Sequence, residues 1–201
     1  MKITGLDLSL KKTGIAHIHI EQVLPEIPLI REVRPVRATT CRVVPAKSLG
    51  EGHERLDFVL REVGQHTRGA DLVLLEGLAF SQSTNQASQL AGLHWLVRHA
   101  LWRWGKPYAV VITQHLKIYA TGRGTKVDKD DVLAAMIKRY SEVEIAGNDG
   151  ADALACAAIG AHYLGFPLRP VPQDHSRALD MMTWPERVQQ LKEVTVEWAT
   201  R

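Results

Sequence analysis

The stretch KITGLDLSLKKTGIAHIHI, residues 2–20, contains two strand-like segments separated by a short polar turn. The segment 2–9 is largely apolar, and in 13–20 isoleucine alternates with histidine at the two-residue period of a half-buried strand. Because the turn between them is so short, we predict that the two segments form an antiparallel hairpin. His17 and His19 then lie on the solvent face of the second strand, and we favour that interpretation over a histidine pair that binds metal.

The segments after this hairpin alternate between strand and helix patterns. A proline-containing irregular connection at 21–35 leads to a third strand at 36–45, which is rich in β-branched residues. The later segments are an amphipathic helix at 48–66, a buried strand at 70–76, a long helix at 84–104, a strand at 108–113, a short helical turn with a glycine-rich loop at 114–126, and helices at 128–140 and 148–164. This order predicts an α/β fold with helices flanking a mixed five-stranded sheet.

The end of the chain has a different composition. It begins with a proline-rich stretch, and Thr183 and Glu186 then have the spacing of a helical capping box. We therefore expect one domain at 1–165, followed at 166–201 by a linker and a C-terminal helix. That helix is expected to dock on the domain rather than on a partner.

Bulk composition narrows the class of protein. The chain has 201 residues, of which 45% are hydrophobic and 23% charged, as is usual for a single soluble globular domain. A formal net charge of +3 excludes a polybasic coat, so any nucleic-acid binding must come from local clusters of charge. The N-terminus lacks the pattern of a signal peptide, and we see no run that would cross a membrane. We expect a cytoplasmic protein with Cys41 and Cys156 reduced.

Carboxylates occur where the sequence is expected to be buried. Asp7 lies within the first strand, and Glu76 ends the apolar strand that follows the first helix. Asp149 and Asp152 are three residues apart at the start of the helix at 148–164, so they share one helical face. Helix capping accounts for one of these two aspartates, but the small apolar residues after them predict a helix packed closely on the sheet. Four acids meeting at one end of a sheet would repel one another unless they bound a hard divalent cation.

Four motifs, taken together and in this order, resemble the RuvC family of Holliday-junction resolvases: GLDLSLKKTGIA at 5–16, LVLLEG at 72–77, KVDKDDVLAAM at 126–136 and DGADALACAAIGA at 149–161. The first motif is closer to the phage-type members, which favour DLS before TG over the DPG of the bacterial type. The resemblance covers about residues 1–165. It implies an RNase H-like fold and a homodimer that uses Mg²⁺ or Mn²⁺. It also implies that Asp7, Glu76, Asp149 and Asp152 are the catalytic metal ligands.

A basic cluster precedes the acidic helix. It comprises Lys117, Arg123, Lys126 and Lys129, around the glycine-rich loop. A strongly negative metal site requires nearby cations to hold a DNA phosphate against it, and glycine lets the backbone approach that phosphate. The resemblance implies catalytically important lysines at Lys117 and Lys129. It also suggests a base-contacting aromatic at Phe80, for which a packing role is equally consistent with the sequence.

The helix at 84–104 carries two apolar stripes, more than one sheet requires. They are Leu90, Val97, Leu101 and Trp104 on one side, and Leu93, Leu96 and Ala100 on the other. The RuvC family dimerises through this helix, so the resemblance implies a homodimer. The alternative is that the C-terminal helix covers the second stripe.

The preferred function is a Mg²⁺-dependent endodeoxyribonuclease that resolves Holliday junctions or other branched DNA. A first alternative is a YqgF-type RNase H-like nuclease acting on RNA. True ribonucleases H are less similar to this chain, because their glutamate lies on the first helix, whereas Glu76 ends a predicted strand. A second is an actin- or hexokinase-like nucleotide-binding protein, which shares the first-strand aspartate but requires a second lobe. A third, a non-catalytic junction-binding protein, is disfavoured because all four acids are present.

Overall fold

The computed structural model describes residues 1–23, 32–50, 52–78 and 85–200. Its centre is a five-stranded sheet in the order β3-β2-β1-β4-β5. The strands are β1 (Lys2–Asp7), β2 (Thr13–Val23), β3 (Glu32–Val43), β4 (Leu72–Glu76) and β5 (Tyr108–Val111). The first three pair antiparallel, whereas β1, β4 and β5 run parallel, so the predicted mixed sheet and N-terminal hairpin are confirmed.

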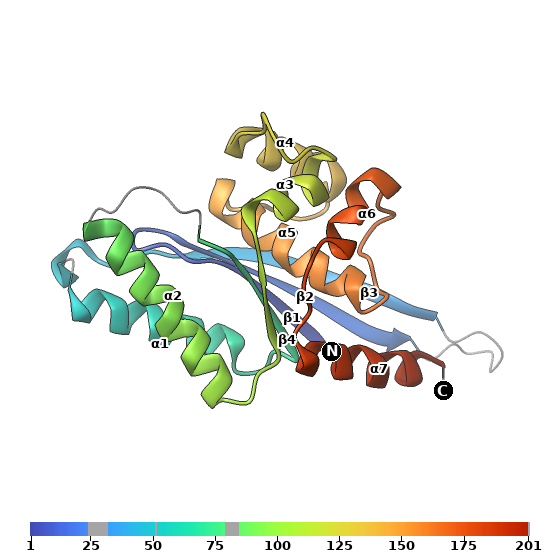
Figure 1. The fold of residues 1–201 in the computed structure, drawn as a ribbon, viewed down its shortest axis with the longest axis horizontal. Helices are drawn as coiled ribbons and strands as arrows, with labels where there is room; N and C mark the ends of the chain where they lie inside the picture. The colour runs from blue at the N-terminus through green and yellow to red at the C-terminus, as the bar shows by residue number, and fades with distance from the viewer. Residues whose placement is uncertain (24–31, 51, 79–84, 201) are drawn as a thin grey trace.

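Helices cover both faces of this sheet (Figure 1). One face carries α1 (His53–Thr67) and α2 (Asn85–Arg103). The other carries α5 (Gly147–Tyr163), with α3 (Thr113–Thr121), α4 (Lys129–Arg139) and α6 (Gln173–Asp180) outside it, and α7 (Glu186–Thr200) packs at the lower edge. A short 3-10 helix, η1 (Lys47–Leu49), precedes α1. The chain thus forms the flanked sheet of an RNase H-like fold, with a separate hydrophobic core on each face.

Small side chains bring α5 very close to the sheet. Every residue from 150 to 161 of this helix is buried. A Cβ atom at Gly5 of β1 would lie 2.0 Å from the carbonyl oxygen of Ala153, and one at Gly14 of β2 would lie 2.0 Å from that of Asp149. The predicted close packing is therefore confirmed, and glycine at these two strand positions permits it. The first turns of α5 consequently lie directly over the ends of β1 and β2.

Two strands are longer than the sequence predicted. The segment 21–35 was expected to be irregular, yet β2 continues to Val23 and β3 begins at Glu32, with these two residues paired. The register shifts at His19/Ile20, next to the pair formed by Ile20 and Pro35. Proline has no N–H to donate to the ladder, and a bulge accommodates it there. Proline therefore shifts the pairing at this point without ending the strand.

His17 does not simply face solvent, as the sequence predicted. Its Nε2 lies 3.1 Å from Nδ1 of His66 on α1, and its Nδ1 lies 3.1 Å from the hydroxyl of Thr4. Burial, together with the charge of the nearby Lys2 ammonium, lowers the pKa of His17 to about 3. The ring is thus a neutral, partly buried part of the packing between α1 and the sheet. The prediction was wrong here because the alternation of a strand does not show which helix will cover its polar side.

The exposed face of α2 also differs from the prediction. Leu93, Val97 and Leu101 are spaced by four residues and are fully buried against the sheet. Leu93 therefore belongs with Val97 and Leu101, not with Leu96 as expected. The exposed large side chains are Trp95, Leu96, Trp102 and Trp104. In the part of the chain that the structure describes, Trp95, Leu96 and Trp102 thus form an exposed apolar face of α2, which is largely aromatic and differs from the predicted stripes.

The residues after 165 contain two helices. A C-terminal helix was expected and is present as α7, whereas α6 was not predicted. Both pack on the α5 side of the sheet, through Ala178 and Met182 near α6 and Val188 in α7. Within the parts of the chain that the structure describes, none of the helices combines the length and apolarity needed to cross a bilayer.

Candidate active site

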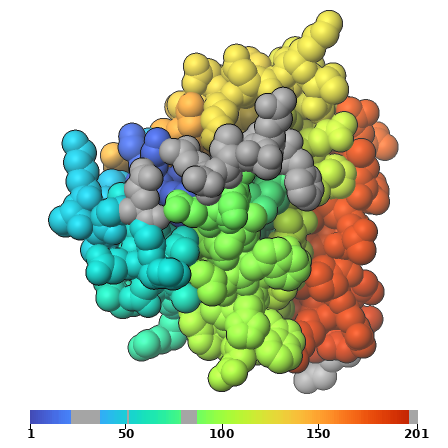
Figure 2. Space-filling view, turned by 60° about the vertical axis from the view of Figure 1, so that its left-hand side comes forward, coloured from blue at the N-terminus to red at the C-terminus, as the bar shows by residue number. Residues whose placement is uncertain are grey.

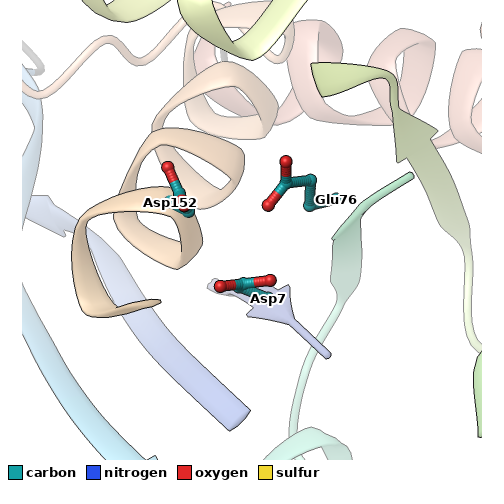
Figure 3. Close-up of side chains that lie close together, drawn as sticks. All are labelled: Asp7, Glu76 and Asp152. Atoms are coloured by element: carbon teal, nitrogen blue, oxygen red, sulfur yellow. The ribbon is translucent and has the colours of Figure 1, made fainter. Parts of the chain in front are cut away.

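Three carboxylates converge at one end of the sheet (Figure 3). Asp7 is the last residue of β1, Glu76 is the last residue of β4, and Asp152 lies in the second turn of α5. One oxygen from each lies within 4.8 Å of the others. Three elements that are distant in sequence thus place acidic groups at a common point.

Strand alternation explains why the two strand carboxylates point the same way. Ile3 and Gly5 of β1 lie beneath α5, so Asp7, two residues further on, faces the same side. In β4, Leu74 packs under Gly160 of α5 and Glu76 follows at the same phase. The parallel register of the two strands then sets Asp7 beside Glu76. The first turns of α5 supply Asp152 from above.

In the absence of a cation, the surroundings of Asp7 and Asp152 disfavour the charged forms of their carboxyl groups. Asp7 is 9% exposed and Asp152 is 4% exposed. Burial, together with the charges of Glu76 and Asp152, raises the pKa of Asp7 from 3.8 to about 9. Burial and the Glu76 carboxylate raise the pKa of Asp152 to about 7, although Lys129 opposes that change. Without a bound cation these groups therefore retain protons near neutral pH.

A basic side chain stands at the mouth of the cluster. Lys129, the first residue of α4, places its Nζ 3.8 Å from Oδ2 of Asp152. Burial works against its charged form, but the Asp7 and Asp152 carboxylates outweigh that effect and raise the pKa of Lys129. Asp128 and Asp131 form a capping box that fixes the start of α4. Lys129 therefore remains charged beside the acids.

The other predicted cations lie further out. Lys117 of α3 is half-buried and donates a 2.6 Å hydrogen bond from Nζ to the carbonyl of Val127. Arg123 and Lys126 are exposed on the loop between α3 and α4, where Gly122 and Lys126 have positive φ values of 77° and 54°. Lys117 thus lies near enough to Asp152 to lower its pKa, whereas Arg123 lines a pocket with Arg139 and His175, next to α6. Phe80 lies outside the described residues.

Asp149 is close to the cluster but paired elsewhere. In the described part of the chain, the group of converging oxygens consists of Asp7, Glu76 and Asp152 and does not include Asp149. Its Oδ2 lies 4.0 Å from Nε of Arg42, which also donates to the carbonyl of Ala146. Arg42 reaches this point from β3, an edge strand. This pair could not be predicted from the sequence, because the contact spans more than half of the chain.

Thr113 is a second residue that the sequence analysis missed. It is the first residue of α3, and its hydroxyl donates a 2.9 Å hydrogen bond to Oε1 of Glu76. Glu76 ends β4 and Thr113 comes just after β5, and because these strands are parallel neighbours, both residues lie at the same edge of the sheet. The position of Thr113 directly after a predicted strand was the only sequence signal that it lies near the acids. A threonine at that position is also typical of an ordinary helix start.

The donor set fits a hard divalent cation. Buried carboxylates that must otherwise stay protonated are stabilised in their charged form when a cation is bound. Oxygen ligands favour Mg²⁺ or Mn²⁺ over Zn²⁺, and Asp7, Glu76 and Asp152 supply one oxygen each. Asp149, one helical turn from Asp152, is available to enlarge the set.

The mixed sheet and its flanking helices have the architecture of an RNase H-like fold. No protein-family model matches the sequence, and no curated protein matches it either. Among solved structures, Thermus thermophilus RuvC is similar to this chain, with a TM-score of 0.59 and 17% sequence identity. The structure of T. thermophilus RuvC in complex with Holliday junction substrate is also similar, with a TM-score of 0.55 and 18% sequence identity. Each comparison covers 86% of this chain and 100% of the other.

A viral structure shares the same architecture. The fowlpox virus Holliday junction resolvase is similar with a TM-score of 0.50 at 13% identity, covering 82% of this chain and 98% of that one. At such low identity these likenesses establish the shared fold. The RNase H-like fold predicted from the motifs is therefore confirmed.

We predict that the metal-free protein loses stability as pH rises. The folded-state pKa values of Asp7 and Asp152 lie above 3.8, so the folded protein binds more protons than the unfolded chain between about pH 4 and about pH 9. The contribution to stability is present below this window and is lost as pH rises through it. Thermal unfolding in EDTA is expected to show a midpoint that falls from about pH 6 to about pH 9, with a smaller fall for Asp7→Asn.

Magnesium should reverse this trend, since the cation displaces the retained protons. We expect Mg²⁺ to raise the midpoint more at high pH than at low pH. If the unfolding midpoints of wild type and Asp7→Asn depended on pH identically in EDTA, burial of Asp7 would not be the cause of the loss of stability at high pH.

Proposed function

We propose that this chain is a structure-selective DNA endonuclease that hydrolyses phosphodiesters in Holliday junctions or other branched DNA. The observation that carries the proposal is the convergence of Asp7, Glu76 and Asp152 at one end of an RNase H-like sheet. We assign the nuclease domain to residues 1–165, treat 166–201 as an extension, and favour the phage-type subgroup and a cytoplasmic location.

The residues of the chain have distinct roles in this proposal. Asp7, Glu76 and Asp152, joined by Asp149, would hold Mg²⁺, for which Mn²⁺ could substitute. The cation would supply activation of water and stabilisation of the negative charge that develops at the phosphate. Lys129 holds the phosphate near the acids, and Lys117, Arg123 and Lys126 bind neighbouring phosphates. The backbone approach expected at Gly122 is not open, because Asp174 and His175 of α6 pack against that glycine.

The decisive experiment compares three synthetic substrates. A four-way junction, a linear duplex and an RNA–DNA hybrid are incubated with the protein in Mg²⁺ or in EDTA. We expect cleavage of the junction in Mg²⁺ and none in EDTA. Preferred cleavage of the hybrid would favour an RNA-processing nuclease instead, and binding of a nucleotide without cleavage would favour a nucleotide-binding protein.

The two lysines should affect turnover more than a cation elsewhere. We expect Lys117→Ala and Lys129→Ala each to slow junction cleavage by about tenfold or more, because hydrogen bonds to charged groups are among the strongest single contacts. Lys192→Ala on α7 is the control. The cleavage rate of every variant is measured at saturating junction concentration. Similar rates for all three variants would contradict the assignment of the lysines.

We also infer that the protein acts as a homodimer through α2. A four-way junction presents two equivalent strands, and two active sites related by a two-fold axis match it. Figure 2 shows α2 as a broad surface between α1 and the C-terminal segment. Trp95 and Trp102 are 63% and 59% exposed on this helix, and beside Trp102 a groove continues between α2, β5 and the start of α7. An aromatic surface of this kind is typical of an interface centre.

A further inference from the structure

The end of β5 and the end of β4 are tied together where the acidic site begins. Glu76 pairs with Val111 in the parallel register, and the N–H of Gly77 donates a 2.7 Å hydrogen bond to the carbonyl of Val111. A Cβ atom at Gly77 would lie 3.2 Å from the side chain of Val110, so the two strand ends are close. The chain then turns into α3, and Thr113 is set beside the Glu76 side chain.

The hydroxyl of Thr113 makes a specific contact with one metal-binding candidate. It donates to Oε1 of Glu76 over 2.9 Å, and both side chains are half-buried. A donor fixed on one oxygen restricts rotation of the carboxylate and leaves the second oxygen free to accept another partner. The contact therefore determines which way the Glu76 carboxylate faces.

Glu76 requires such support more than the two aspartates do. Its side chain has one more rotatable bond than aspartate, and it is less buried than Asp7 and Asp152. Without the Thr113 contact, the Glu76 side chain could adopt other rotamers, and the cation would have to restore its order on binding.

We propose that Thr113 is a positioning residue that holds Glu76 ready to bind the metal. The proposal rests on the function proposed above, in which Glu76 is a metal ligand. Thr113 acts through Glu76 and does not touch the substrate. Hydrogen-bonding partners of metal ligands commonly change metal affinity by about tenfold to a hundredfold, which sets the size of the expected effect.

The geometry of α3 separates this role from that of Lys117. Thr113 and Lys117 are four residues apart and share one face of the helix, but their partners differ. Thr113 contacts the Glu76 carboxylate, whereas Lys117 is held by the carbonyl of Val127. Loss of the threonine hydroxyl should therefore weaken metal binding, and loss of the lysine should slow turnover at saturating metal.

The test is Mn²⁺ binding to the DNA-free protein, measured by calorimetry. Thr113→Val keeps the shape of the side chain and removes its hydroxyl, and we expect it to weaken Mn²⁺ binding by about tenfold. Thr113→Ser retains the hydroxyl and should bind Mn²⁺ within about twofold of wild type. Thr195→Val is the matched control, because this buried threonine on α7 donates to the carbonyl of Leu191 and lies outside the site.

Two results would overturn the proposal. One is a folded Thr113→Val protein that binds Mn²⁺ as tightly as wild type. The other is a Thr113→Ser protein that binds as weakly as Thr113→Val, since the effect would then not follow the hydroxyl. Metal binding is measured without DNA, so it is independent of the proposed nuclease activity. A wild-type protein that binds Mn²⁺ but cleaves no junction would contradict the proposed function and leave the role of Thr113 intact.

Discussion

Replacing Asp7 with asparagine is expected to lower the rate of junction cleavage by about a thousandfold or more while junction binding is retained. Bound metal supplies several kcal/mol of transition-state stabilisation, and each ~1.4 kcal/mol corresponds to a factor of ten in rate. Asp7 is one of the three converging acids, and asparagine has the same shape without the charge. The measurement is single-turnover cleavage of a labelled four-way junction in Mg²⁺, alongside binding of the same junction.

Binding should survive this change because one fewer negative charge faces the DNA phosphates. Asp57→Asn provides the control, since Asp57 is exposed on α1 and lies outside the acidic cluster. It is expected to cleave at the wild-type rate. Turnover by Asp7→Asn within about tenfold of wild type would exclude Asp7 as a metal ligand, and with it the proposed chemistry.

The acids could be located from the sequence because their positions follow from strand geometry. Asp7 and Glu76 each end an apolar segment, and parallel neighbouring strands bring their carboxyl ends to the same edge. The small residues after Asp152 predicted a helix packed closely on the sheet, which the structure confirms. Local periodicity and chain direction were sufficient for these three residues.

The partners of the acids could not be predicted, because they depend on tertiary contacts. Arg42 reaches Asp149 from an edge strand, and Thr113 reaches Glu76 from the start of a helix. Neither contact leaves a repeating pattern in the sequence. The same limitation affected His17, whose environment is set by the helix that covers it.

The acidic cluster links stability to function in this fold. Two of its carboxylates lie in surroundings that raise their pKa values, so the metal-free protein is less stable at high pH than it would be without them. In the proposed function, a bound cation would offset that cost and would also supply the chemistry. Asp7→Asn is therefore expected to stabilise the metal-free protein at high pH although it abolishes cleavage.

Replacing Trp95 and Trp102 together with glutamate is expected to convert a dimeric protein into a folded monomer. Both side chains are exposed, so the change leaves the cores intact. Trp95 packs against Arg98 at 4.3 Å and Trp102 stacks on His99, which keeps the aromatic face ordered. Buried tryptophans at interfaces commonly contribute about 2 kcal/mol or more each, so their joint loss should weaken dimerisation by roughly a thousandfold. Sedimentation at micromolar concentration, with and without junction DNA, measures the result.

Two single variants separate loss of the dimer from loss of folding. Leu93→Glu places a charge in the fully buried side of α2 and should unfold the protein. Ile137→Glu changes a half-exposed residue on α4, on the opposite face of the sheet, and should leave the dimer unchanged. A Trp95→Glu and Trp102→Glu monomer should still cleave single strands but lose paired incision of a junction, because one chain carries one acidic cluster. A wild-type protein that stays monomeric on junction DNA would instead require both strands to be cut by one active site in turn.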